Sequence, residues 1–365
     1  MKYVWGGMQL SNIKRMFPGG NTSEGFYSLH KFIMGDNANK VFILKGGPGG
    51  GKSSLMSSIA NEMAKIGYTI EYHHCPSDEN SIDGIVIEEL GVGILDGTAP
   101  HVIDPSIPGI LDKIINLGDF IDERKLIEYK EEIVKAKNEN KKCYRKTYAY
   151  FRAAKEIYKE IEENNSSNMN FSKVNKLTYD LMRNIYNDYG IESFIGKERH
   201  LFSSAYTPGG LIEHIDTILE YTQNIYYIKG DIGTGKTTFM QKIMHEGLIR
   251  GLNVEIYHNP LIPSKIETIV IPEVKIAVTA SKASAKYNHE EIDLDVFLNK
   301  GLENQRDYEI LEELISEGVN NLKEAKKNHD ILEKCYAPSM DFQGVNKKRD
   351  DLLAEILSLH RIRDI

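Results

Sequence analysis

An internal duplication is the feature that most constrains how this chain can fold. At an offset of 184 residues, 17 of the 45 positions from Lys45 to Glu89 are identical to those from Lys229 to Glu273, without a gap. Unrelated segments of average composition match at roughly 6% of positions. The chain is therefore expected to contain two copies of one unit, residues 1 to about 198 and about 199 to 365.

The register extends weakly in both directions. Upstream, the same offset aligns pairs of residues that include Arg15 with Arg199. Downstream, MNFSKVNK (169–176) resembles MDFQGVNK (340–347) at an offset of 171, so the second copy has lost about a dozen residues in between. We expect both copies to have the same order of elements.

Each copy contains an apolar run, VFIL (41–44) or IYYI (225–228), followed by a Gly-rich turn and a helical pattern. A second strand, a Pro-containing loop and a third apolar stretch come next. Short apolar runs of this kind are typical of buried parallel strands. The pattern predicts an α/β fold with a parallel sheet in each copy.

Long helices are predicted in the remainder of each copy. From 122 to 164, apolar residues recur at intervals of three and four with no Gly or Pro. A second helix is expected to run to about 187. In the second copy, helices are expected around 307–333 and 345–359. We predict an inserted or appended helical hairpin in each copy.

The Gly-rich turns carry the clearest chemical signal. GGPGGGKS (46–53) and GDIGTGKT (230–237) both satisfy GxxxxGK[ST], the P-loop pattern, in which backbone N–H groups and a helix N-terminus bind a polyphosphate. Lysine reaches the β- and γ-phosphates, and the Ser or Thr hydroxyl binds Mg²⁺. The predicted nucleotide-binding residues are Gly46, Gly47, Gly49, Gly50, Gly51, Lys52, Ser53 and Ser54, with Gly230, Asp231, Gly233, Thr234, Gly235, Lys236, Thr237 and Thr238.

We therefore predict two tandem P-loop NTPase domains. The expected boundaries are 1–110 for the first NTPase domain, 111–198 for the first helical hairpin, 199–282 for the second NTPase domain and 283–365 for the second hairpin.

A P-loop needs a second carboxylate to hold the metal ion, normally at the end of a neighbouring strand. Asp96 closes the run GVGILD and is the candidate, although DG is also a common turn. In the second copy the register places Ala280 there, which has no ligand atom. The metal ligands are predicted to be Ser53, Asp96 and Thr237, with the second site binding nucleotide without efficient hydrolysis.

Hydrolysis also needs a group that orients water and a cation that neutralises charge. Glu89 and His74 are the water-orienting candidates, and the alternatives are a solvated acid and a hydrogen-bonded strand-end histidine. Arg15 and Arg199 are candidates for the cation, and the alternative is that they form surface salt bridges. The predicted catalytic set is Lys52, Asp96, Glu89 and His74.

A basic stretch lies in the first long helix. Residues 135–155 hold eight Lys/Arg and one acid, Glu139, interleaved with aromatic residues. Such a stretch suits a protein partner or nucleic acid, whereas the simpler interpretation is a solvated helix face with tyrosines packed inward.

Composition limits the remaining possibilities. The formal charge of -8 argues against non-specific coating of nucleic acid, and no apolar stretch is long enough to span a membrane. The first fifteen residues lack the features of a signal peptide. The three cysteines form no CxxC pair, which favours a reduced, cytoplasmic protein.

The doubled P-loop, the segment YHHCPSDENSIDGIVIEELGVGILDGTAPH (72–101) and RHLFSSAYTPGG (199–210) together resemble a family of duplicated P-loop ATP-binding proteins of Gram-positive, often spore-forming bacteria. The resemblance covers nearly the whole chain. It implies ATP binding and a predicted ATPase activity, and it makes Asp96 to His101 a family motif beside the nucleotide, from which TASKAS (279–284) departs.

The leading hypothesis is an Mg²⁺-dependent ATP hydrolase, acting on the β–γ phosphoanhydride, or a switch whose helical hairpins transmit the nucleotide state. A small-molecule kinase with an acceptor pocket in the segment 74–83 is one alternative. A nucleotide-sensing scaffold with negligible turnover is another. An ABC-type ATPase is disfavoured because the chain has no LSGGQ-like segment.

Overall fold

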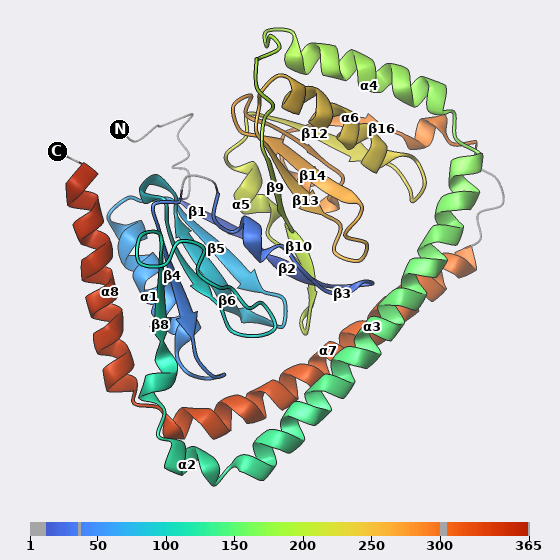
Figure 1. Cartoon of the computed structure of the whole chain (residues 1–365). Helices are drawn as coiled ribbons and strands as arrows, with labels where there is room; N and C mark the ends of the chain where they lie inside the picture. The colour runs from blue at the N-terminus through green and yellow to red at the C-terminus, as the bar shows by residue number, and fades with distance from the viewer. Residues whose placement is uncertain (1–11, 36–37, 300–304, 364–365) are drawn as a thin grey trace.

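The structure is a computed structural model that describes residues 12–35, 38–299 and 305–363. It contains two α/β domains, connected by a long pair of helices (Figure 1). Residues 1–11, which carry most of the argument against a signal peptide, lie outside the described residues.

Each domain is built on a six-stranded sheet, and the two sheets have equivalent strand orders. The first sheet runs β1 (Ile13–Met16), β5 (Ile70–Cys75), β6 (Asp78–Ile87), β7 (Val92–Asp96), β4 (Lys40–Lys45), β8 (Asp112–Asn116). The second runs β9 (Glu198–Leu201), β13 (Val254–His258), β14 (Ile266–Ile271), β15 (Ile276–Thr279), β12 (Asn224–Lys229), β16 (Glu290–Asp293). The repeat in the sequence is therefore a repeat of the fold.

The prediction of fully parallel sheets was wrong for one strand in each domain. Strand β6 is antiparallel to β5 and β7, and β14 is antiparallel to β13 and β15. Only two residues separate β5 from β6, and a connection this short can join only antiparallel strands. The segment expected to be a loop, which includes Asp78 and Asp83, is therefore mostly a core strand.

Two small hairpins connect the domains reciprocally. They are β2 (Gly19–Thr22) with β3 (Gly25–Ser28), and β10 (Ser204–Thr207) with β11 (Gly210–Glu213). The Ser23 amide, in the first hairpin, donates to the Leu261 carbonyl of the second domain at 2.9 Å. The Thr207 hydroxyl, in the second hairpin, donates to Glu79 of the first domain at 3.1 Å. Phe17 and Phe202 exchange both backbone hydrogen bonds between them.

The helices are α1 (Lys52–Lys65), α2 (Glu123–Ile127), α3 (Lys130–Ser167), α4 (Phe171–Tyr186), α5 (Ile215–Leu219), α6 (Lys236–Ile249), α7 (Gln305–Tyr336) and α8 (Phe342–Arg363). Helices α1 and α6 follow the segments 46–51 and 230–235, which match the P-loop pattern and are called the first and second P-loop below, and each packs on its own sheet. None of the helices within the described residues is long and apolar enough to cross a membrane.

The long helices occur where they were predicted, but the predicted hairpins do not pack as hairpins. Helix α4, from the first copy, packs on α6 of the second domain through Val174, Leu181 and Ile185. Helix α8, from the second copy, packs on α1 of the first domain through Val345 and Leu352. The two copies have therefore exchanged their last helices, and each of these helices lies beside a helix of the other domain (Figure 1).

Helices α3 and α7 pack along each other and form the arm that crosses between the domains (Figure 1). At 1.5 Å per residue, the 38 residues of α3 extend about 57 Å. The buried ring of Phe151 packs against Gly318 of α7, where a Cβ atom would lie 2.2 Å from the ring. The Gly318 carbonyl also accepts a hydrogen bond from the Thr147 hydroxyl at 3.2 Å. Gly318 therefore marks the closest approach between α3 and α7 that we identify.

We predict that Gly318→Ala destabilises the protein by about 1–2 kcal/mol, because the added methyl group overlaps a buried ring. Glycine to alanine in an exposed helix normally has the opposite effect. Urea unfolding followed by circular dichroism measures the change. The exposed substitution Asn320→Ala, two residues further along α7, serves as the control. A higher unfolding midpoint for Gly318→Ala would contradict the packing described here.

Candidate functional site

The two P-loops have the same backbone conformation. In the first, Gly49 and Gly51 have φ of +66° and +83°, and α1 begins directly after Gly51. In the second, Gly233 and Gly235 have φ of +87° and +92°, and α6 begins directly after Gly235. Positive φ at alternate residues turns successive N–H groups toward one side, which forms an anion-binding concavity.

The predicted phosphate-binding residues all lie on these loops or on the first turn of the following helix. The first N–H groups of α1 have no acceptor within the helix, as at every helix start. Among the described residues, the amides of Gly49 and Gly51 also donate to no backbone acceptor. The first loop therefore presents several N–H groups beside the positive end of the α1 dipole.

Lys52 and Asp96 face each other across the first loop. Asp96 ends β7, the parallel neighbour of β4, and its Oδ2 lies 3.6 Å from Lys52 Nζ. Lys52 Nζ also donates to the carbonyl oxygens of Gly46 and Gly47, both at 2.9 Å. Adjacent parallel strands end at the same edge of the sheet, so β4 and β7 deliver the loop and the carboxylate to one place.

The residues of the first site fit an Mg²⁺ ion. The Ser53 hydroxyl lies on the first turn of α1 and accepts one hydrogen bond, from the Ile82 amide at 3.1 Å, which leaves a second lone pair. Asp96 Oδ1 accepts from the Thr98 amide at 2.8 Å. Hydroxyl and carboxylate oxygens are the hard donors that Mg²⁺ prefers.

The second site has a different set of charged groups. Lys236 Nζ donates to the carbonyl oxygens of Gly230 and Asp231, both at 2.6 Å, as Lys52 does in the first site. Ala280, the counterpart of Asp96, directly follows β15, so the second site has no carboxylate at this position. The Asp295 carboxylate instead accepts from the Asp231 amide of the loop at 2.8 Å. Burial lowers the pKa of Lys236 to about 8.

Asp231 adds a further carboxylate to the second loop. Its Oδ1 accepts from the Ile232 amide at 2.7 Å. Two loop amides are thus bound by carboxylates, and both carboxylates would repel a phosphate. Thr237 remains on the first turn of α6, but no carboxylate at position 280 complements it. The residues of this site fit Mg²⁺ less well than those of the first.

Each P-loop is covered by the corner between two long helices of the other copy. We call residues 333–345, where α7 meets α8, the C-terminal elbow. It covers the first loop: a Cβ atom on Gly47 would lie 2.7 Å from the Tyr336 ring, and one on Gly49 would lie 3.1 Å from the Glu333 carbonyl oxygen. The Phe342 ring lies against Gly51.

We call residues 162–174, where α3 meets α4, the N-terminal elbow. It covers the second loop: the Asn165 amide donates to the Ile232 carbonyl at 2.8 Å, and the Ser166 hydroxyl donates to the Gly233 carbonyl at 3.0 Å. The Phe171 ring lies against Gly235. The arm therefore connects the two sites physically, because α3 ends on the second loop and α7 ends on the first.

The sequence prediction missed these elbow residues. Thr98, which lies in the segment 96–101 that the family resemblance places beside the nucleotide, donates its hydroxyl to the Gly46 carbonyl at 3.2 Å. The signal for the elbows was present in the sequence. The repeated segments MNFSKVNK and MDFQGVNK place Phe171 and Phe342 at the same position, and both rings contact a P-loop glycine.

The structure does not bring Glu89 to the P-loop. Glu89 precedes β7 and therefore lies at the opposite edge of the sheet from Asp96. Its carboxylate accepts from the Thr69 amide and hydroxyl. Its counterpart Glu273 accepts from Asn253 in the same way. The repeated glutamate has a structural role, and we withdraw it as a water-orienting group.

His74 also lies away from the first P-loop. It is the penultimate residue of β5, three strands from β4, a separation of about 14 Å at the usual strand spacing. Its Nε2 is 2.9 Å from an Arg15 nitrogen, and its ring lies 4.5 Å from that of His214. Burial and these cationic neighbours lower the pKa of His74 to about 3. The structure therefore gives His74 a packing role between the domains and not the catalytic role predicted from the sequence.

The upstream alignment of Arg15 with Arg199 was off by one residue. Lys14 pairs with Glu71 on β5, and Arg199 pairs with Glu255 on β13, so Lys14 and Arg199 are the equivalent residues. The structural offset there is 185 rather than 184. Arg15 corresponds to His200, which contacts His258 as Arg15 contacts His74.

Arg199 joins the two domains. Its guanidinium donates to both carboxylate oxygens of Glu71, at 2.6 and 2.7 Å, and to the carbonyl oxygens of Phe32 and Ile33. These four hydrogen bonds commit the guanidinium to the contact between the domains. Neither Arg15 nor Arg199 is placed to neutralise charge at a phosphate.

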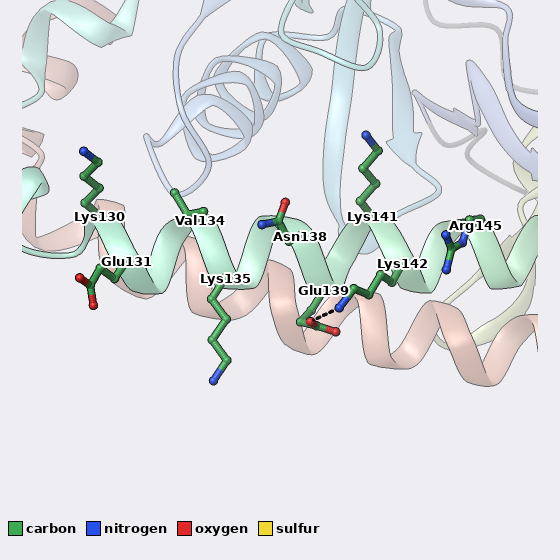
Figure 2. A pocket seen from close by; sticks show the side chains of 9 residues that line it. All are labelled: Lys130, Glu131, Val134, Lys135, Asn138, Glu139, Lys141, Lys142 and Arg145. Carbon is green, nitrogen blue, oxygen red and sulfur yellow. Dashed lines mark hydrogen bonds and ion pairs between the residues drawn. The ribbon is translucent and has the colours of Figure 1, made fainter.

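The basic stretch of α3 presents its charges outward and its aromatic rings inward. Figure 2 shows Lys135, Lys141, Lys142 and Arg145 beside a surface hollow of about 980 Å³ along this helix. Tyr148 instead points inward and donates to Asn21 at 3.1 Å. Phe151 is buried and the three tyrosines of the stretch are half-buried, so none of these rings is fully exposed for bases to stack on. A partner for this face stays a prediction, and the hollow lies away from the P-loops.

Comparisons with known proteins give no further assignment, since no family model, curated protein or solved structure matches this chain.

The Arg199–Glu71 ion pair is expected to make the free energy of unfolding depend on pH. Burial alone would raise the pKa of Glu71, but the Arg199 guanidinium outweighs burial and holds the pKa well below 4.5. The ionised form therefore stabilises the fold above about pH 4.5, and this stabilisation is lost as pH falls through the lower folded-state pKa.

We predict that Glu71→Gln lowers the free energy of unfolding by about 3–5 kcal/mol at pH 7, since it leaves a buried guanidinium without its carboxylate. The difference from wild type should shrink below about pH 4.5. Glu255→Gln weakens a longer 3.4 Å contact of the same arginine, and glutamine can still accept the hydrogen bond of the Tyr257 hydroxyl, so this matched control should cost less. A pH-independent difference measured by denaturant unfolding would contradict the assignment.

Proposed function

We propose that the chain binds Mg²⁺-ATP at the first P-loop and hydrolyses it slowly, while the second P-loop mainly binds nucleotide. The observation that carries this proposal is the contrast between Asp96, 3.6 Å from Lys52, and Ala280, which has no carboxylate. The glycine conformations, by comparison, are shared by both loops.

In the proposed first site the chain binds and orients the polyphosphate. The loop amides and the α1 N-terminus donate to phosphate oxygens, and Lys52 neutralises the charge that develops on the γ-phosphoryl group. Ser53 and Asp96 would hold the Mg²⁺ ion, which supplies further charge neutralisation when bound. Thr98 fixes Asp96 and the loop relative to each other, because it bonds to both.

The second site is proposed to bind without efficient turnover. It keeps Lys236 and Thr237 but lacks the carboxylate at the end of β15. Asp231 and Asp295 occupy loop amides that a phosphate would otherwise use.

The kinase alternative receives less support. It required an acceptor pocket in the segment 74–83, and most of that segment forms the β5–β6 hairpin in the core of the sheet. The scaffold alternative differs from the proposal only in turnover. Steady-state kinetics therefore separate these two.

We predict that Lys52→Ala and Asp96→Asn each lower ATP hydrolysis at least about 100-fold, because each removes a charge that stabilises the transferring phosphoryl group. Lys236→Ala should change the rate little. Phosphate release in excess Mg²⁺-ATP is the measurement. Equal losses from Lys52→Ala and Lys236→Ala would contradict the asymmetry, and wild-type turnover at background with nucleotide retained would favour the scaffold.

The elbows support a second part of the proposal: each copy senses the nucleotide held by the other. The C-terminal elbow contacts the first loop and continues into α7, which packs along α3, and α3 ends at the second loop. A ligand that changes either elbow is thereby coupled to the other site, and such coupling is reciprocal.

Phe342 and Phe171 allow a matched test of this coupling. They are 42% and 39% exposed, so their loss should not unfold the protein. We predict that Phe342→Ala weakens nucleotide binding at the first site about fivefold, the equivalent of one aromatic contact of about 1 kcal/mol. Phe171→Ala should do the same at the second site. Titration with a fluorescent ATP analogue, in Lys236→Ala and Lys52→Ala backgrounds respectively, distinguishes the sites.

A further inference from the structure

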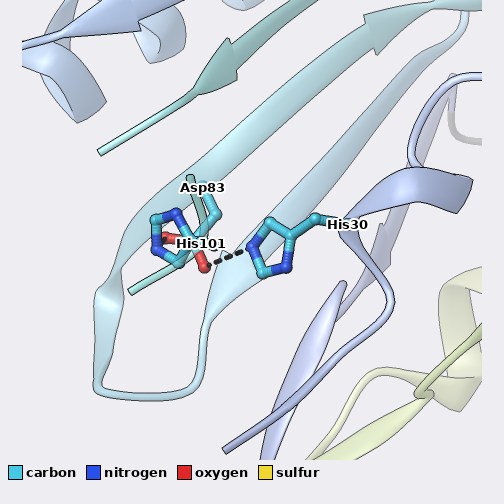
Figure 3. A group of neighbouring side chains, drawn as sticks. All are labelled: His30, Asp83 and His101. Atoms are coloured by element: carbon cyan, nitrogen blue, oxygen red, sulfur yellow. Dashed lines mark ion pairs between the residues drawn. The ribbon is translucent and has the colours of Figure 1, made fainter. Parts of the chain in front are cut away.

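Two imidazoles and a carboxylate converge in the first domain, on elements that the sequence separates. His30 lies on a short 3-10 helix after β3, Asp83 on the antiparallel strand β6, and His101 in the loop after β7. All three are buried, with exposed fractions of 5%, 3% and 8%. Figure 3 shows the His30 ring directed at the Asp83 carboxylate with the His101 ring beside it, and the two imidazole rings stack with their centroids 4.4 Å apart.

The distances in this cluster are too long for hydrogen bonds. His30 Nε2 lies 3.5 Å from Asp83 Oδ2, and His101 Nε2 lies 3.5 Å from Asp83 Oδ1. Good N–H···O bonds measure 2.7–3.2 Å. Two ligands of one tetrahedral ion with bonds of about 2.0–2.1 Å lie about 3.3–3.4 Å apart. Candidate ligand atoms from all three residues lie within 4.8 Å of one another.

The hydrogen bond on the far side of the His101 ring leaves the near side of that ring without a proton when the ring is neutral. His101 Nδ1 lies 3.2 Å from the Asp96 carbonyl oxygen, which can only accept, so Nδ1 carries the hydrogen. His30 Nδ1 lies 2.9 Å from the Ser28 hydroxyl. In the neutral ring of His101, the Nε2 lone pair then faces the acidic oxygen of Asp83. The two acceptor atoms, His101 Nε2 and Asp83 Oδ1, then face each other and repel. A cation bound between them would remove this repulsion.

Two of the atoms involved also lack partners. Among the described residues, His30 Nε2 and Asp83 Oδ2 are buried side-chain atoms without a hydrogen bond. Leaving such an atom unpaired costs about 1–3 kcal/mol. A neutral imidazole and an ionised carboxylate are the forms that bind metals.

We propose that His30, Asp83 and His101 bind a divalent transition-metal ion of the Zn²⁺ class. Two imidazole nitrogens and one carboxylate suit zinc better than Mg²⁺ or Ca²⁺, which prefer oxygen ligands only. Ser28 and the Asp96 carbonyl orient the two rings from behind, as second partners of metal-bound histidines usually do. The second copy lacks this set, since Glu267 and Ala285 occupy the positions of Asp83 and His101.

The proposed ion lies immediately behind the first nucleotide site. His101 bonds to the backbone carbonyl of Asp96, whose side chain faces Lys52. An ion held by His101 therefore fixes the end of β7 and the position of the Asp96 carboxylate. Metal binding itself does not depend on the proposed ATPase activity, so the two proposals can fail separately.

The test is a Co²⁺ titration of the full chain after chelator treatment and dialysis, without nucleotide. We expect one Co²⁺ per chain with the strong visible absorption of a four-coordinate site, displaced by Zn²⁺. His101→Gln and Asp83→Asn should each weaken binding at least about 10–100-fold. His245→Gln, an exposed histidine outside the cluster, is the control and should bind as wild type does.

The variant His30→Cys keeps the proposal testable if the other variants fail to fold. A thiolate is also a ligand for Co²⁺ and Zn²⁺, so this variant should keep the ion and add a sulfur-to-cobalt absorption band in the near ultraviolet. The proposal is overturned if wild type takes up no Co²⁺, or if folded His101→Gln binds it as tightly as wild type. Weak absorption typical of six oxygen ligands would place the ion elsewhere and would equally overturn it.

Discussion

Each α/β domain completes its core with a helix from the other copy, and the rest of the structure depends on this exchange. Val345 and Leu352 of α8 are buried against α1, and Val174 and Leu181 of α4 are buried against α6. Because each long helix must cross to the opposite domain, α3 and α7 run side by side. The same crossing brings each elbow onto the other copy's P-loop, so the packing of the core and the covering of the sites have one cause.

The two sites share a backbone and differ in their side chains. Glycines with positive φ give both loops the same anion-binding shape. In the first domain, Asp96 completes the charge pattern around Lys52, and the His30–Asp83–His101 cluster lies behind it. In the second domain, Ala280 removes the carboxylate and Asp295 binds a loop amide. In our proposal, the shared loop shape lets both sites bind nucleotide, and the different charged neighbours limit efficient turnover to the first site.

Local patterns predicted the elements well, and contacts between distant segments were the main failure. The repeat, the P-loops, the Asp96–Ala280 contrast and the long helices were all visible in short stretches of sequence. The sequence could not show that α4 and α8 change domains, since it shows an apolar helix face but not the surface on which that face packs. The antiparallel β6 was missed because its polar start, DENS, masks a strand. Glu89 and His74 were misassigned because repetition in a duplicated chain marks structural residues as readily as functional ones.

The exchanged helices also have a consequence for how the duplication can change over time. A chain with a single copy of this unit would have to trade its last helix with a second, identical molecule, and the resulting two-fold pair would have two identical sites. Joining the copies in one chain removes that symmetry requirement. A substitution such as alanine at position 280 then alters one site only. The partner that supplies the covering elbow is also always present, at a concentration fixed by the covalent connection.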